Sequence, residues 1–158
     1  MIFVSVGTNS EKPFSRLIKK MDEIAGKIDE KVIMQIAESE YIPVNSEYYR
    51  YLPFDRVIKY LKAARVYVCH AGTGSIIVGL SNGVPTIVVP RDKKFNELPD
   101  DHQQKTALAF GKEDLVWIAY TLDDLESLVL DRNLNVKKVK IQKTLLINRL
   151  KNYLKSIK

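Results

Sequence analysis

The sequence predicts an α/β fold, in which a parallel β-sheet is covered by helices on both faces. Apolar, β-branched runs alternate with segments of helical periodicity along most of the chain. Runs such as VYVCH (66–70) and PTIVVP (85–90) are apolar at successive positions, which is typical of strands buried on both faces. A length of 158 residues with 46% hydrophobic residues suits one domain with a sizeable core.

The first half of the chain contains three predicted strands and two predicted helices. IFVSV (2–6) and VIMQIA (32–37) are short buried strands, and SEYYRYLP (46–53) is a more polar strand that ends at Pro53. Pro13 suits the first position of a helix. That helix carries an apolar stripe of Phe14, Leu17, Ile18, Met21 and Ile24, and the helix over 54–64 carries one of Phe54, Val57, Ile58 and Leu61.

The second half continues the alternation. The strand 66–70 is followed by a helix over 73–83 that ends at Gly83, and then by the strand 85–90. After a polar loop (91–100), a helix over 101–111 begins with Asp101 at the N-cap or first turn. LVWIAY (115–120) is the last strand, and a Thr121–Asp124 capping pattern opens the helix 121–130.

The net charge of +6 is unevenly distributed. Residues 1–131 hold 16 Lys/Arg against 19 Asp/Glu, a net charge of −3, whereas residues 132–158 hold nine Lys/Arg and no acid. We expect 132–158 to add a basic amphipathic helix to the domain formed by 1–131. Its apolar face comprises Val139, Leu146, Leu150, Tyr153, Leu154 and Ile157. Such a helix suits an anionic membrane surface, a partner subunit or packing on the sheet. Nucleic acid is disfavoured, because Tyr153 is the single aromatic residue among these charges.

Composition points to a cytoplasmic protein without a metal site or a cofactor. Cys69 is the one cysteine, so the sequence holds no disulfide framework and no metal-ligand cluster. No apolar run approaches the roughly 20 residues that span a bilayer. The N-terminus, MIFVSVGTNS, reads as a first strand and lacks the basic leader of a signal peptide.

Parallel sheets bind ligands beyond the carboxyl ends of their strands, where the strand order reverses. The loop after 2–6 offers Gly7 and Thr8, with Asn9 and Ser10 at the helix entrance. The loop after 66–70, HAGTGS, offers Gly72, Thr73, Gly74 and Ser75. Successive N–H groups at a helix N-terminus favour a phosphate there. A capped helix start and a tight turn are the structural alternatives for these two loops.

HAGTGS differs from two known phosphate loops. No Lys-Ser/Thr pair follows it, as a Walker loop requires, and Ile77 stands where a dinucleotide fingerprint has its third glycine. The third loop, RDKKFNELPDDHQQ, brings His102 and Gln103 to the start of the next helix. A solvated loop with a helix cap is its alternative reading, and His70 can equally be a strand-end histidine.

Together, HAGTGS, GVPTIVVP and DDHQ resemble the C-terminal, donor-binding domain of glycosyltransferase family 28, and FVSVGTNSEKPFSRL resembles the start of its free-standing members. The resemblance covers about residues 1–120. It implies a Rossmann-like domain equivalent to the C-terminal half of a GT-B glycosyltransferase. It also implies a donor diphosphate beside Gly7, Thr8, Gly72, Thr73, Gly74 and Ser75. The donor sugar would lie beside His70, Asp101, His102 and Gln103.

The family usually places a ribose-binding acid at the position of Val78, and no Asp or Glu occurs from Arg56 to Arg91. Three explanations remain open. The ribose is held by the backbone or by another side chain, the nucleotide differs, or this chain binds poorly and acts as a scaffold.

The resemblance implies the donor-binding subunit of a two-component glycosyltransferase. Such a subunit binds a UDP-sugar, either UDP-GlcNAc or another UDP-hexose, and works at the cytoplasmic face of a membrane. A membrane-anchored partner holds the lipid-linked acceptor and supplies the general base, since no residue of this chain is a convincing base. The alternative is a non-catalytic nucleotide-binding or scaffold subunit.

Overall fold

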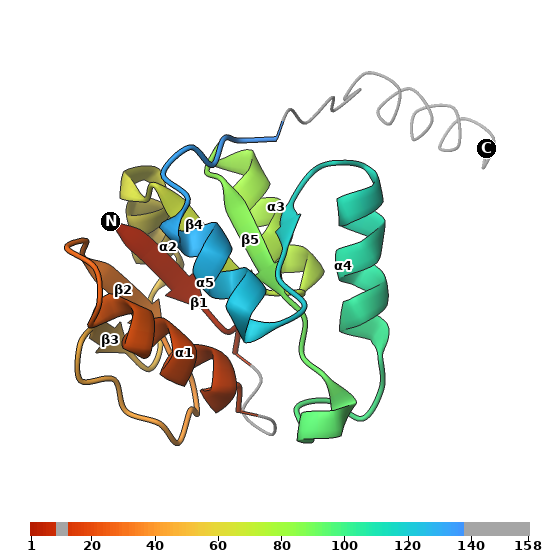
Figure 1. The fold of residues 1–158 in the computed structure, drawn as a ribbon, viewed down its shortest axis with the longest axis horizontal. Helices are drawn as coiled ribbons and strands as arrows, with labels where there is room; N and C mark the ends of the chain where they lie inside the picture. The colour runs from red at the N-terminus through yellow and green to blue at the C-terminus, as the bar shows by residue number, and fades with distance from the viewer. Residues whose placement is uncertain (9–12, 138–158) are drawn as a thin grey trace, which may run out of the picture.

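The structure, a computed structural model, describes residues 1–8 and 13–137 and confirms the α/β fold. Its core is a six-stranded sheet with the order β3-β2-β1-β4-β5-β6, in which every pairing is parallel (Figure 1). The strands are β1 (Ile2–Ser5), β2 (Val32–Gln35), β3 (Glu47–Tyr49), β4 (Val66–His70), β5 (Thr86–Val89) and β6 (Trp117–Ile118).

Helices cover both faces of the sheet. Helices α1 (Ser15–Ala25) and α5 (Leu122–Leu130) pack on one face, where the core includes Leu17, Met21 and Leu125. Helices α2 (Phe54–Ala63), α3 (Thr73–Ser81) and α4 (His102–Lys112) lie on the other face, whose core includes Leu61, Ile76 and Ala107 (Figure 1). Because both faces are covered, four of the six strands are buried along nearly their whole length.

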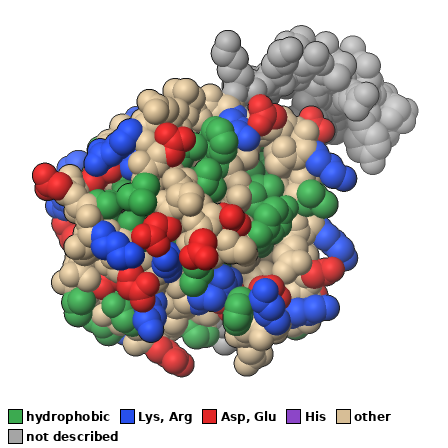
Figure 2. All heavy atoms as spheres, in the orientation of Figure 1, with side chains coloured by type: hydrophobic (Ala, Val, Ile, Leu, Met, Phe, Trp, Pro, Cys, Tyr) green, Lys and Arg blue, Asp and Glu red, His purple; other side chains and the backbone are tan. Residues whose placement is uncertain are grey.

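Polar contacts fasten the first helical layer. The Nζ of Lys27 lies 3.0 Å from a carboxylate oxygen of Glu126 on α5, and Lys20 pairs with the other oxygen of the same carboxylate. Figure 2 shows cationic and anionic side chains interspersed over this face.

Several element boundaries differ from those predicted. The edge strand β3 has three residues instead of eight, and β6 has two instead of six. Helix α1 begins at Ser15, after Pro13, because Phe14 turns its backbone out of the helical region and buries its ring in the core. Helix α3 ends at Ser81, and Gly83 follows with a φ of 65°.

The predicted helix starts differ in how they are capped. The Oγ1 of Thr121 accepts from the Asp124 amide at 3.0 Å, and the Asp124 carboxylate accepts from the Thr121 amide at 2.9 Å. This capping box confirms the prediction for α5. Asp101 is the N-cap residue of α4, but its carboxylate makes no cap bond and instead pairs with Lys105 at 3.0 Å.

The chain continues past α5 across the sheet. Leu134 is buried there, and the Nε1 of Trp117 donates to the Asn135 carbonyl at 3.3 Å. Most of the predicted amphipathic helix, from residue 138 onward, lies outside the described residues. Within 1–8 and 13–137, no helix combines the length and the apolar character needed to cross a bilayer.

Candidate functional site

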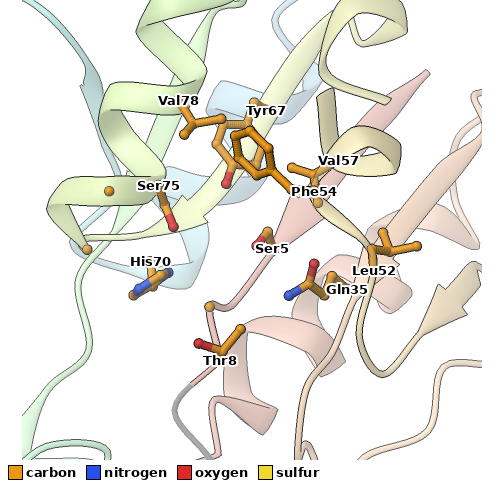
Figure 3. A pocket seen from close by; sticks show the side chains of 13 residues that line it. Ser5, Thr8, Gln35, Leu52, Phe54, Val57, Tyr67, His70, Ser75 and Val78 are labelled. Carbon is orange, nitrogen blue, oxygen red and sulfur yellow. The ribbon is translucent and has the colours of Figure 1, made fainter. Parts of the chain in front are cut away.

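A pocket opens at the carboxyl ends of the central strands, as predicted from the strand order. The chain leaves β1 toward β2 on one side of the sheet, whereas β4 follows on the other side, so the order reverses between β1 and β4. The register places Ser5 beside Gln35 of β2 and beside Cys69 of β4, so their loops meet at one edge. The pocket has a volume of about 410 Å³ (Figure 3). It is lined by Ser5, Gly7, Thr8, Gln35, Leu52, Phe54, Val57, Tyr67, His70, Gly72, Gly74, Ser75 and Val78.

The pocket has a polar end and an apolar end. Figure 3 shows Thr8, His70, Ser5 and Gln35 at the polar end. Tyr67, Phe54, Val57 and Val78 lie together at the apolar end, and Ser75 lies between the two groups. Among residues 1–8 and 13–137, no lining residue is an Asp, Glu, Lys or Arg, so the donors that this part of the chain offers to an anion are neutral.

The N-terminus of α3 forms one wall of the pocket. Gly72 is its N-cap residue, and no side chain caps this end. The first N–H groups of a helix have no partner within the helix and carry its positive partial charge. Gly74 and Ser75 lie in the first turn and line the pocket, whereas Thr73 is exposed and outside the lining. This end of the helix can therefore bind a phosphate group through amides and the Ser75 hydroxyl.

The His70 ring is held between two glycines. A Cβ atom built on Gly72 would lie 2.3 Å from the His70 Nε2, and one built on Gly7 would lie 2.6 Å from the Cε1. Gly7 also has a φ of 77°, which disfavours residues with a side chain. Both glycines therefore allow the imidazole to sit at the pocket floor. The sequence placed Gly72 in a loop that favours a phosphate, and it did not indicate this contact with the histidine ring.

His70 is neutral and incompletely hydrogen-bonded. Burial and the nearby charge of Arg91 lower its pKa from 6.5 to about 4, although the Ser5 backbone acts in the opposite direction. Its buried Nδ1 has no hydrogen-bond partner within residues 1–8 and 13–137. A neutral imidazole can donate one hydrogen bond and accept another. His70 thus retains hydrogen-bonding capacity at the place where a ligand would lie.

The loop after β5 supports the site from behind. The Oε1 of Gln103 accepts from the Arg91 amide at 3.1 Å, and the Nη2 of Arg91 donates to the Val6 carbonyl at 3.0 Å. Both side chains are buried. This chain of contacts joins α4 and β5 to the residue that precedes Gly7. Gln103 therefore has a structural partner, and it does not line the pocket.

Asp101 and His102 also lie outside the pocket lining. The Asp101 carboxylate pairs with Lys105, and the His102 Nδ1 contacts the Asp100 carboxylate. Both side chains are exposed. Farther back, Arg16 of α1 makes two bonds of 2.9 Å to the Glu97 carboxylate, which fastens the same loop to the first helix. Of the three loops that were predicted to bind the ligand, those after β1 and β4 line the pocket. The loop after β5 contributes no lining residue.

Six lining residues were not predicted: Ser5, Gln35, Leu52, Phe54, Val57 and Tyr67. Ser5 and Gln35 end β1 and β2, so the rule that ligands bind at strand ends could have identified them. Leu52 comes from the β3–α2 connection, and Phe54 and Val57 come from α2. Their apolar spacing is that of ordinary core residues, and the sequence contains no signal that distinguishes a pocket-lining residue from a core residue here.

The family model for the glycosyltransferase family 28 C-terminal domain matches residues 1–156. The UDP-N-acetylglucosamine transferase subunit ALG13 of Kluyveromyces lactis is 38% identical over 77 residues. That alignment covers 49% of this chain and 37% of the relative, so this chain matches well under half of that protein's length.

Solved structures share the fold. An NMR structure of ALG13 aligns with a TM-score of 0.58 at 20% identity, covering 94% of this chain and 93% of that one. The calicheamicin glycosyltransferase CalG4 aligns with a TM-score of 0.67 at 16% identity, covering 99% of this chain and 43% of that one. MurG of Acinetobacter baumannii aligns with a TM-score of 0.56 at 18% identity, covering 84% of this chain and 42% of that one. Because the family model spans almost the whole sequence, the chain belongs to the glycosyltransferase family 28 C-terminal domains.

Proposed function

We propose that this chain is the donor-binding subunit of a two-component glycosyltransferase and binds a nucleoside-diphosphate sugar in the pocket beside α3. The observation that carries the proposal is the uncapped N-terminus of α3, which meets a neutral, incompletely bonded His70 in a pocket of about 410 Å³. A diphosphate would receive amide hydrogens from Gly72–Ser75 and hydroxyl hydrogens from Thr8 and Ser75. The likeness to ALG13 supports UDP-N-acetylglucosamine or another UDP-hexose as the donor.

Glycosyl transfer breaks the bond between the anomeric carbon and the diphosphate, so negative charge builds on the leaving group. Preorganised amides and a helix dipole stabilise that charge without reorganising. The proposed role of this chain is to bind the donor and to stabilise its leaving group. Asp101, His102 and Gln103 remain candidates for sugar contacts, provided that the loop after β5 rearranges when the donor binds.

The acceptor hydroxyl also needs a general base. No carboxylate of the described residues lines the pocket, and a histidine with a pKa of about 4 is a weak base at neutral pH. We therefore assign the base and the lipid-linked acceptor to a membrane-anchored partner. The purified chain alone is then expected to bind donor but to transfer little or no sugar, whereas adding the partner restores transfer. Rapid turnover by the isolated chain would contradict this assignment.

Calorimetry with a panel of UDP- and GDP-sugars tests donor binding. Gly72→Val is expected to abolish binding, because its side chain would displace His70 and cover the amides of α3. Ser81→Val provides a matched control at the exposed far end of the same helix, outside the pocket lining. Equal affinities of the wild type and Gly72→Val would place the nucleotide elsewhere.

The basic segment 132–158 fits work beside an anionic membrane or a partner subunit. Its nine positive charges and its lack of acid favour anionic lipid. Co-sedimentation with anionic vesicles tests the lipid contact, using the full chain and a version that ends at residue 137. The cut falls there because Leu134 packs in the core and Lys137 pairs with Asp114. Equal binding of both versions would exclude a lipid role for the segment beyond 137.

A non-catalytic nucleotide-binding or scaffold subunit is the second candidate. The described lining residues include no carboxylate, which favours this candidate, because these residues offer neither a carboxylate base nor an acidic partner for sugar hydroxyls. One measurement distinguishes the two proposed functions. A complex of this chain with its membrane partner transfers sugar in the first case and remains inactive in the second.

A further inference from the structure

The apolar end of the pocket has a composition that suits a nucleobase better than a carbohydrate. Phe54 is 66% exposed at the pocket rim, and Val57 and Val78 are half-buried against the core on the same side (Figure 3). Aromatic side chains bind the flat faces of bases by stacking. A sugar with several hydroxyl groups would instead lose hydrogen bonds to water on these surfaces. The polar end, with Ser5, Thr8, Gln35 and His70, suits the transferred sugar.

This division fixes the direction of a bound nucleotide. With the diphosphate at the first turn of α3, the nucleoside extends toward Phe54 and the transferred sugar extends away from it, toward His70. Val78 lies on the same face of α3 as Gly74 and Ser75, one helical turn farther from the N-terminus. One turn is about 5.4 Å, which is close to the width of one sugar ring. The pentose of the nucleotide, which links the diphosphate to the base, therefore meets Val78.

Val78 cannot bond to a pentose hydroxyl. Its side chain has no polar atom, and neither do those of Val57 and Phe54 at this end. The hydroxyl of Tyr67, which lies at the same end, is buried and is already hydrogen-bonded to Ser5 and Ser75. A ribose 2′-hydroxyl placed here gives up a hydrogen bond to water and receives none in return. A 2′-deoxyribose has no such hydroxyl and leaves an apolar carbon against the valine.

We infer that this pocket does not recognise the ribose 2′-hydroxyl, and that it binds 2′-deoxynucleoside diphosphates at least as tightly as the matching ribonucleoside diphosphates. The inference rests on the proposed function and specifies its substrate class. The donor need not be a ribonucleotide sugar, and Val78 is the residue that determines this specificity.

The test compares UDP with dUDP, which differ in the 2′-hydroxyl alone, by calorimetry on the full wild-type chain. The expected result is that dUDP binds at least as tightly as UDP. Tighter binding of UDP would overturn the inference and leave the proposed function in place. If neither nucleotide binds, the proposed function fails and the inference fails with it. The comparison of UDP with dUDP on the wild-type chain therefore distinguishes failure of the inference from failure of the proposed function, and no variant is needed.

A pair of glutamate variants tests the role of Val78. Val78→Glu supplies an acceptor beside the pentose, and we expect it to shift the ratio of the two dissociation constants toward UDP by about tenfold or more. Ile77→Glu adds the same charge to the neighbouring residue, which is half-exposed and outside the lining, and should leave the ratio unchanged. Circular dichroism verifies that both variants fold. A ratio that does not change in folded Val78→Glu would remove Val78 from the pentose site.

Discussion

Two buried titratable side chains in this protein have opposite hydrogen-bonding environments. The Asp22 carboxylate on α1 accepts from the Tyr41 hydroxyl, from the amides of Val44 and Asn45 and from the Ser46 hydroxyl, all at 2.8–2.9 Å. The His70 ring at the end of β4 has a buried Nδ1 without a partner in the described part of the chain. One group is saturated by its own loop, and the other faces a cavity.

The two environments indicate two roles. Burial alone would raise the pKa of Asp22, but its four donors keep that pKa below its ordinary value, so the carboxylate stays charged and holds the loop that leads into β3. Burial of His70 lowers its pKa and leaves bonding capacity unused. Buried polar groups without partners are costly, so each one that a fold keeps requires an explanation, such as a bound ion or a catalytic role. Asp22 therefore maintains the fold, while His70 has unused hydrogen-bonding capacity in the pocket.

Removing the saturated group should have the largest effect on stability. Asp22→Ala leaves several buried donors without an acceptor, and we expect it to lower the free energy of unfolding by about 3–5 kcal/mol. Urea denaturation measures the change. Asp29→Ala, at an exposed position, is the control and should shift stability by less than about 0.5 kcal/mol. Similar midpoints for the two variants would show that the Asp22 bonds are not structural.

The unsaturated group should make folding sensitive to pH. The pKa of His70 is about 4 in the folded chain against an ordinary 6.5, so the unfolded state binds a proton first as the pH falls. The contribution of His70 to the free energy of unfolding is fully present above pH 6.5. It declines by about 3 kcal/mol as the pH falls to about 4.

Thermal unfolding of the wild type and of His70→Gln from pH 7.5 to 4 measures this effect. The carboxylates are common to both proteins, so the difference between the two curves isolates the histidine. The wild type should lose stability more steeply between pH 6.5 and 4. Parallel curves would mean that His70 is no harder to protonate in the folded chain than in the unfolded one.

The contrast between these groups also shows what the sequence could predict. Apolar periodicity is a local property of the sequence, so it predicted the six strands and five helices of the described residues. The position of the pocket followed from the rule that parallel sheets bind ligands at the carboxyl ends of their strands. The role of Asp22 was not predictable. It lies within the apolar stripe of α1, and its donors come from residues 19–24 positions later in the chain.

The candidate site was predicted in part for the same reason. The small residues after β1 and β4 indicated a phosphate loop, and both loops do reach the pocket. The contact between Gly72 and His70 depends on the rotamer of His70, and the contact between Gly7 and His70 depends on the approach of two loops. Residue spacing predicts neither. Likewise, the DDHQ pattern marks a helix start, but it does not reveal that Gln103 bonds to the Arg91 backbone.

A smaller loss of stability is expected when a side chain is added at Gly72, next to the His70 ring. Gly72→Ala places a methyl group against the imidazole and should cost about 1–3 kcal/mol, as overpacking does in other cores. The same change in a His70→Ala background should cost little, because the ring that it meets is gone. A double-mutant cycle from urea denaturation gives the coupling between the two positions. Additive effects would show that Gly72 is required for its backbone and not for this contact.

The smallest expected change in stability comes from Gly74→Ala, which should affect stability and ligand binding in opposite directions. A Cβ built on Gly74 meets no atom within 4 Å, so Gly74→Ala is free of strain and replaces a flexible residue inside α3. We expect a gain of about 0.4–1 kcal/mol, seen as a melting temperature that is higher by about 1–4 °C. The new methyl group nevertheless stands at the pocket wall where the diphosphate is proposed to bind. Calorimetry should therefore show weaker UDP binding by a more stable protein. If UDP affinity were unchanged while the melting temperature rose, the open space beside Gly74 would serve no ligand.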